Sequence, residues 1–345
     1  MTNSIALSRC GFLHGSGLTA AGAAVITAAP GLGGADGARA AGPSLTNPFS
    51  GSIIYADSYQ DRSKLTRVDG ATGKRKNMRD RRTDMHPSID PYRWDRIVCS
   101  SRLSQGWVLR IVHARGRFLE TLTDETLGSA ITPAWDPCGR FVAYTWVTGQ
   151  EPRVRILDTE AKRNVFETAD AGLAPTWSPW HGKSVSLAYF SNRAALGLNE
   201  IWQIDLTWNG GAFDGTAPMA LTEAYVDDVN LDPPGLIEQK VPAWSPDGNH
   251  IAYWQGVEID DPRPTGEVPR DVWIMNADGS GHRRLVNNSD DPFWSPDSAD
   301  VGIPINIPLG PTTEPLAVGA VNPDGANERT LFYTKGNFVR ATWSI

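Results

Sequence analysis

The stretch PAWSPDGNHIAYW, from Pro242 to Trp254, joins a tryptophan to a tight turn and a second apolar run. Within SPDG, Pro246 presets φ and Gly248 accepts a positive φ, so these four residues reverse the chain. The apolar and β-branched residues on both sides then predict two antiparallel strands. Nearly the same phrase recurs along the chain, and this recurrence decides the fold.

The phrase has four clear copies, a weak copy before them and a truncated copy at the end. They read HPSIDPYRWDRIVCS, TPAWDPCGRFVAYTW, APTWSPWHGKSVSLAYF, VPAWSPDGNHIAYWQ, DPFWSPDSADVGI and RATWSI. Their anchors are Ile89, Trp135, Trp177, Trp244, Trp294 and Trp343. Neighbouring anchors lie 42 to 67 residues apart. Periods of about 40–50 residues with four short strands per unit indicate a β-propeller.

The two ends of the repeat region complement each other. The first unit, GSIIYADSYQDRSKLTRVDGATGKRKNM, has second, third and fourth strands but no tryptophan phrase before it, whereas FVRATWSI supplies a first strand with nothing after it. Because a closed ring removes the open sheet edges, the C-terminal strand is expected to complete the first blade. The prediction is an all-β fold over residues 48–345: a six-bladed propeller of four-stranded antiparallel blades, closed by the C-terminal strand.

The pattern PAWSPDG…IAYW…DVWIMNADGSGHRRL resembles the repeats of the TolB-type propeller family, also described as WD40-like PD40 repeats. The resemblance covers essentially residues 48–345, and the sixth unit departs from it because Ser298 replaces the turn glycine. It implies a six-bladed propeller and an exported protein. The family is similar in fold to the propellers of prolyl-oligopeptidase-type peptidases and oligogalacturonate lyases, so the resemblance does not choose an activity.

The first 40 residues have the pattern of an export signal, with cleavage near Ala40/Ala41 and a short linker over residues 41–47. Residues 8–13, SRCGFL, resemble the twin-arginine signal, but Cys10 stands where the second arginine belongs. The apolar stretch at residues 17–30 is too short and too rich in Ala and Gly for a membrane span. We therefore expect a secreted or cell-envelope protein, periplasmic or extracellular, with no stable membrane span in the mature chain.

Charge and loop length point to the kind of partner and to one face of the ring. A net charge of −7 argues against nucleic acid. The long segments all connect second to third or fourth to first strands, which share one face: residues 191–199, 221–240, 256–270 and 306–315. Such a one-sided distribution favours ligand binding at that mouth of the channel.

Polar residues just before the anchors are expected to point toward the channel at that mouth, and they are the candidate ligand-binding residues. They are Asp84, His86, Glu238, Lys240, Asp291 and Arg340. Both charge signs converge in this set, which suits a polar ligand or a peptide end. The alternative is that these side chains simply line a water-filled channel.

The sequence contains few patterns typical of catalytic or metal-binding sites. The mature chain has no G-x-S-x-G nucleophile elbow, and its histidines occupy unlike repeat positions. No cofactor is expected. The acidic loop 227–238 places Asp228, Asn230 and Asp232 like calcium ligands, but Pro233 stands where the turn glycine belongs, so we expect at most weak calcium binding there.

Two remaining features fit the same repeat map. Cys99 and Cys138 could form a disulfide, although their repeat positions differ; Cys99 is expected to be buried and Cys138 to lie near the surface. The basic run from Lys74 to Arg82 falls largely on the outer strand of the first blade, where charge discourages edge pairing or could contact an anionic polymer.

Two hypotheses about function remain open. The first is a non-catalytic, monomeric binding module for an envelope protein or glycan. The alternative is a secreted carbohydrate-active enzyme, a polysaccharide lyase or glycoside hydrolase, that acts at the channel mouth through groups such as His86, Lys240 and Arg340. In that alternative Tyr59 or Tyr225 would stack on sugar rings.

Overall fold

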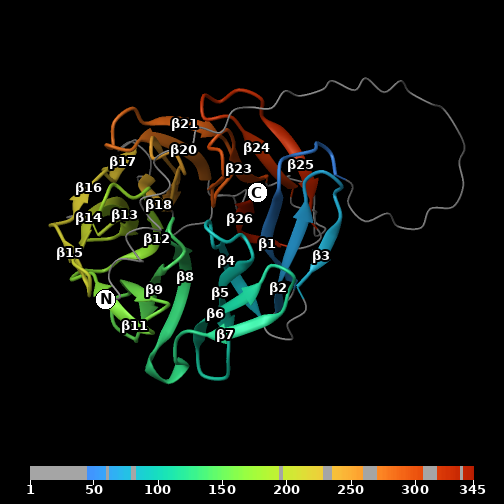
Figure 1. The fold of residues 1–345 in the computed structure, drawn as a ribbon. Helices are drawn as coiled ribbons and strands as arrows, with labels where there is room; N and C mark the ends of the chain where they lie inside the picture. Colours follow the sequence, from blue (N-terminus) through green and yellow to red (C-terminus); the bar gives the residue numbers. More distant parts are fainter. Residues whose placement is uncertain are drawn as a thin grey trace, which may run out of the picture.

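Six antiparallel β-sheets surround a central axis in the computed structural model (Figure 1). The structure describes residues 45–59, 62–78, 83–193, 197–227, 235–258, 270–305, 317–334 and 337–345. The predicted export signal at residues 1–40 and most of the linker lie outside this part of the chain. The six sheets confirm the predicted six-bladed propeller, and we number the blades 1 to 6 in chain order.

The strand that carries the anchor lies nearest the channel in each blade, and the strands that follow it in the chain pair outward from it; in blade 5 a short extra strand precedes it. Blade 1 contains β26 (Asn337–Ser344), β1 (Ser52–Tyr59), β2 (Arg62–Asp69) and β3 (Arg75–Asn77). Blade 2 contains β4 (Asp84–Ile89), β5 (Arg96–Arg102), β6 (Trp107–His113) and β7 (Phe118–Thr121). Blade 3 contains β8 (Ser129–Trp135), β9 (Phe141–Val147), β10 (Arg153–Asp158) and β11 (Arg163–Glu167). A 3₁₀ turn, η2 (Glu125–Leu127), precedes blade 3.

Two of the other three blades carry a short strand beyond the predicted four. Blade 4 contains β12 (Leu173–Trp177), β13 (Ser184–Ser191), β14 (Glu200–Trp208) and β15 (Phe213–Gly215), and β16 (Met219–Ala220) also pairs with β14. Blade 5 contains β17 (Tyr225–Asp227), β18 (Gly235–Trp244), β19 (His250–Glu258), β20 (Arg270–Asn276) and β21 (Arg283–Val286). Blade 6 contains β22 (Phe293–Trp294), β23 (Val301–Ile305), β24 (Ala317–Val321) and β25 (Arg329–Tyr333).

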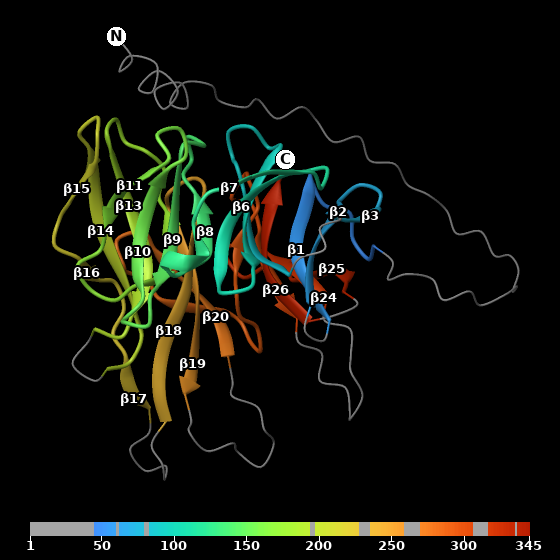
Figure 2. The same cartoon turned by 90° about the horizontal axis from the view of Figure 1, so that it is seen from below.

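The C-terminal strand closes the ring as predicted. β26 lies beside β1 in both views (Figures 1 and 2), and their antiparallel register runs from Ser52–Ser344 to Ser58–Asn337. The anchor Trp343 is 4% exposed in an apolar cluster with Phe49 and Phe293, and its Nε1 donates to the carbonyl of Ser50 at 2.7 Å. The last strand is therefore a packed part of blade 1.

Hydroxyl groups and tryptophan side chains bind each blade to the next near the channel. The backbone N–H of Trp135 donates to Ser88 Oγ at 3.0 Å across the junction of blades 2 and 3. In the same way, Trp244 donates to Thr176 Oγ1 at 3.1 Å between blades 4 and 5. At other junctions the indole N–H crosses instead, from Trp177 to the carbonyl of Ala134 at 3.0 Å. The recurring tryptophan phrase thus supplies the contacts that the ring needs.

The second strands supply a buried tyrosine, or a cysteine, at the place where neighbouring blades pack. Tyr55, Tyr144, Tyr189 and Tyr253 are each at most 1% exposed, and Cys99 takes the equivalent place in blade 2 as a buried thiol that is not in a disulfide. The expected surface position of Cys138 is wrong, since this residue is 4% exposed and packs with Phe141 and Trp180. Bulky apolar neighbours from blade 4 cover its turn.

Within the described ranges no helix is long and apolar enough to cross a membrane.

The edge position of the basic run is confirmed for its described part, because Arg75 and Lys76 lie on β3, the outermost strand of blade 1. The calcium-like loop falls mostly on residues 228–234, which lie outside the described part of the chain.

Candidate binding site in the central channel

Six residues with positive φ form a ring around the channel, three positions before each anchor. They are His86, Thr132, Ala174, Val241, Asp291 and Arg340, with φ between 43° and 54°. A non-glycine residue rarely adopts this conformation, and the β-branched Thr132 and Val241 are the least suited to it. The strand register shifts at this place in blades 1 to 5. The inner strands of these five blades are therefore bulged, and bulges re-aim side chains near functional sites.

A cavity of 320 Å³ fills the channel from this ring of bulges to the turns between first and second strands. Its walls are built mostly from prolines, anchor residues and small side chains. One set of prolines directly follows the bulges: Pro87, Pro133, Pro175, Pro242 and Pro292. A second set stands in the turns at the mouth: Pro91, Pro137, Pro179, Pro246 and Pro296. Proline has no backbone N–H, so these walls offer apolar surface and few hydrogen-bond donors.

Three charged or titratable residues lie at the inner end of the cavity. Arg340 Nε is 3.7 Å from Asp291 Oδ1, and both side chains are partly exposed, by 18% and 27%. Burial raises the pKa of Asp291, and the charge of Arg340 opposes that rise. Burial and the neighbouring Arg340 lower the pKa of His86 from 6.5 to about 3, so its ring is neutral near pH 7. The inner end of the cavity, which we call its floor, thus combines one ion pair with one uncharged imidazole.

The other three predicted site residues do not line this cavity. Asp84 is 4% exposed at the start of β4, where it accepts a hydrogen bond from Ser101 Oγ. Glu238 is 2% exposed and accepts from Asn199 N and Nδ2 at 2.9 and 2.7 Å. Lys240 Nζ forms an ion pair with Glu238 Oε2 at 2.5 Å. These residues precede the bulges along their strands, on the opposite side from the prolines.

The cavity opens among the short turns, whereas the sequence pointed to the face with the long segments. The turns Asp90–Trp94 and Ser245–Gly248, between first and second strands, stand at its mouth. The side view in Figure 2 shows these strand ends at one end of the ring, together with the C-terminus. Much of the long segments at residues 228–234, 259–269 and 306–316 is outside the described part of the chain, so ligand binding on that face stays a prediction.

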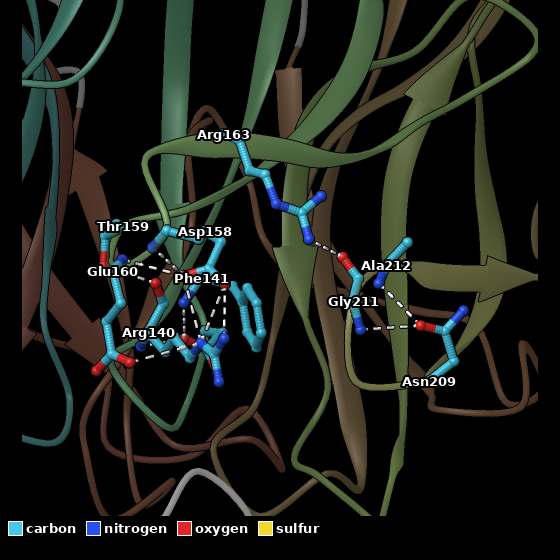
Figure 3. Close-up of polar contacts among 11 residues, drawn as sticks. Arg140, Phe141, Asp158, Thr159, Glu160, Arg163, Asn209, Gly211 and Ala212 are labelled. Carbon is cyan, nitrogen blue, oxygen red and sulfur yellow. Dashed lines mark hydrogen bonds and ion pairs between the residues drawn. The ribbon is translucent and has the colours of Figure 1, made fainter. Parts of the chain in front are cut away.

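Internal hydrogen bonds hold the turns on the cavity's face. In blade 3, Arg140 Nη2 contacts Asp158 Oδ2 at 2.7 Å and joins the two turns of the blade (Figure 3). Arg163 donates to the carbonyl of Gly211 in blade 4, and Asn209 Oδ1 caps the same loop by accepting from Gly211 N and Ala212 N (Figure 3). These contacts hold turns on the same face as the mouth, although none of the residues in them lines the cavity.

The charged and titratable residues at the inner end of the cavity could be predicted from the sequence, but the prolines along its sides were not. His86, Asp291 and Arg340 were selected as polar residues before an anchor, and the structure brings all three to the cavity. The prolines were interpreted only as turn residues. Their recurrence two positions before and two positions after five of the six anchors was the available signal, because equivalent positions in a closed ring meet around one axis.

Comparisons with known proteins support the fold alone. TolB from Acinetobacter baumannii matches with a TM-score of 0.62 at 18% identity over 87% of this chain and 68% of that one. A putative TolB from Agrobacterium tumefaciens gives 0.53 at 18% identity over 83% and 91%. An oligogalacturonate lyase from Vibrio parahaemolyticus gives 0.50 at 10% identity over 83% and 76%. No protein-family model and no curated protein matches the sequence. The resemblance to TolB-type propellers is thus confirmed as a shared six-bladed fold.

Proposed function

We propose that this protein is an exported, non-catalytic β-propeller that binds a segment of a partner protein of the cell envelope in its central channel. The observation that carries the proposal is the proline-walled cavity, with Arg340, Asp291 and His86 among the lining residues at its inner end. The TolB-like fold and the N-terminal export pattern support the envelope setting. The mouth turns Asp90–Trp94 and Ser245–Gly248 are closed by their own backbone hydrogen bonds, which reduces the ordering cost of association.

The wall chemistry favours a protein segment over a glycan in this cavity. A sugar ring carries several hydroxyl groups, and each loses hydrogen bonds to water unless the protein replaces them. Ten of the lining residues are prolines, which donate no backbone hydrogen bond. Apolar peptide side chains instead gain from burial against Pro and Trp at roughly 25 cal/mol per Å². A carbonyl or carboxylate of the segment would be received by the Arg340 guanidinium at the floor.

The geometry gives less support to the lyase or hydrolase alternative. A general base works best when its pKa lies near the operating pH, whereas the pKa of His86 is about 3. Lys240, the second group named for that chemistry, is paired with Glu238 and does not line the cavity. The likeness to the oligogalacturonate lyase concerns the fold.

Selection from a random peptide library, run in parallel with a glycan array, tests the proposal. We expect apolar peptides that bind wild-type protein and bind Arg340→Ala more weakly, with Tyr144→Phe, which alters a buried residue outside the channel lining, as the control. Glycan binding that is lost in Arg340→Ala, without any peptide binder, would contradict the proposal. If pectin or alginate yields unsaturated products that absorb in the ultraviolet, the lyase alternative replaces it.

A further inference from the structure

A second cavity lies between the facing sides of blades 4 and 5, away from the channel. Its volume is 680 Å³, within the range of about 300–1,000 Å³ typical of small-molecule sites. Residues of β14, the segment after β16, β18, β19 and β20 line it, among them Glu200, Thr222, Gln239, Tyr253, Gln255 and Trp273. Blade interfaces are normally apolar, so a set of polar side chains here needs a reason.

Gln239 is the most informative of these side chains. It is 1% exposed, and its amide hydrogen bonds are all long: 3.3 Å to the carbonyl of Glu223, 3.4 Å to Gln255 Oε1 and 3.3 Å from Thr222 Oγ1. Good N–H···O bonds are about 2.9–3.0 Å long. Oε1 accepts one hydrogen bond and keeps a second acceptor site for a ligand, and the two long N–H bonds can be exchanged for shorter ones.

Aromatic residues and a fixed carboxylate form other parts of the wall. The Trp273 ring packs against the apolar cluster that contains Tyr253 and Ile251, which holds its orientation. The Tyr253 hydroxyl lies 2.9 Å from His282 Nδ1. Glu200 is 7% exposed and accepts from Ala224 N through Oε1 at 2.9 Å, so its carboxylate is held at the cavity wall. The site therefore offers a fixed indole beside carboxylate and amide groups.

The equivalent cavity between blades 2 and 3 has different chemistry. There Tyr144, the counterpart of Tyr253, donates to Asn164 Oδ1 at 3.0 Å, and the lining includes Arg155, Lys162 and Arg163. The described lining between blades 4 and 5 contains two glutamates and no lysine or arginine. An anion would be repelled at the second site, whereas a ligand rich in hydroxyl groups can donate to its carboxylates and accept from its amides.

We propose that the cavity between blades 4 and 5 binds one or two units of a neutral carbohydrate. The apolar face of the sugar ring packs on Trp273, while its hydroxyl groups donate to Glu200 and exchange hydrogen bonds with Gln239 and Gln255. This site is separate from the channel, so the protein would hold a glycan on its side and a peptide segment at its axis. The proposal does not depend on the channel function.

Isothermal titration of the full-length purified protein with maltose, cellobiose and N,N′-diacetylchitobiose tests this site. At least one disaccharide is expected to bind wild-type protein and Tyr144→Phe equally well. Gln239→Leu and Trp273→Ala should each weaken that binding about tenfold or more, the loss of one good interaction. Arg340→Ala in the channel should leave it unchanged. If Gln239→Leu fails to fold, the partly exposed Gln255→Leu takes its place.

Four outcomes would overturn the proposal. One is that none of the three disaccharides binds at millimolar concentrations. Another is that binding survives Trp273→Ala and both glutamine variants, which would place the sugar elsewhere. The third is that choline, used as an organic cation that also suits carboxylates and aromatic rings, binds in place of the sugars. Loss of sugar binding in Arg340→Ala alone would assign the glycan to the channel instead.

Discussion

Arg340 and Asp291 meet across the junction of blades 1 and 6, with Nε 3.7 Å from Oδ1, at the floor of the channel. Arg340 lies on the C-terminal strand β26, and Asp291 lies just before β22, so the ion pair joins the closing strand to the last complete blade. Both residues also have positive φ, at 43° and 44°. One contact thus serves ring closure and the proposed binding site together.

A double-mutant cycle measures how much this ion pair contributes to the free energy of unfolding. Asp291→Asn tolerates the left-handed backbone but leaves the Arg340 charge without its partner, and Arg340→Gln does the converse. We expect each single variant to lower the free energy of unfolding by about 1–3 kcal/mol, with a coupling energy of about 0.5–3 kcal/mol in the double variant. Urea denaturation of the four proteins gives these values, and a coupling near zero would show that the pair does not help to close the ring.

Removal of the closing strand should be far more damaging. Deletion of residues 340–345 removes Trp343 from its cluster with Phe49 and Phe293 and exposes an edge of β1. Truncation of the tryptophan alone, as Trp343→Ala, is expected to cost about 3–5 kcal/mol. The melting temperature is the measurement. Deletion of Ile345, which is 70% exposed, is the control and should change little; an unchanged melting temperature after the longer deletion would refute closure through β26.

His86 predicts a dependence of stability on pH. Its pKa is about 3 in the folded protein against an ordinary 6.5, so the unfolded chain binds the extra proton as the pH falls. This residue's contribution is complete above about pH 6.5 and is lost at about 1.4 kcal/mol per pH unit toward pH 3. His86→Asn should remove this slope.

The comparison with His86→Asn is required because Asp136 acts with the opposite sign. Burial raises the pKa of Asp136 to about 6, which lowers stability as the pH rises from about 4 to 6. Subtracting the variant's free energy of unfolding from that of the wild type at each pH isolates His86. Parallel pH profiles for the two proteins would contradict a neutral imidazole at the inner end of the channel cavity.

Export gives an independent prediction. The mature protein should begin near Ala41 and be found outside the cytoplasm, which intact-mass analysis of envelope and culture fractions measures. Since Cys10 interrupts the twin-arginine pair, Cys10→Arg should leave export unchanged or improve it. Recovery of the uncleaved chain from the cytosol alone would contradict the proposal that the protein acts in the envelope.

The repeat architecture could be predicted from the sequence because each unit forms its strands and turns from nearly the same short pattern of residues. The number of blades and the closure through Trp343 followed from that code and from the missing strand of the first unit. The cavity was harder to predict, since a bulge such as the one at Val241 depends on how neighbouring inner strands meet around the axis. The pairing of Lys240 with Glu238 likewise depends on how the blades pack. Both Lys240 and Arg340 are polar residues shortly before an anchor, so the sequence alone could not show that only Arg340 lines the cavity.

The affinity of a library-selected peptide for matched channel variants tests the central claim most directly. Pro246→Trp narrows the cavity mouth, Pro323→Trp places the same side chain in a turn that does not line the cavity, and Lys240→Met alters the opposite side of the bulges. The account predicts at least about tenfold weaker binding by Pro246→Trp and by Arg340→Ala, and near wild-type binding by Pro323→Trp and Lys240→Met. Full affinity in Pro246→Trp and Arg340→Ala, with loss only in Lys240→Met, would contradict it and move the site to the face of the long segments.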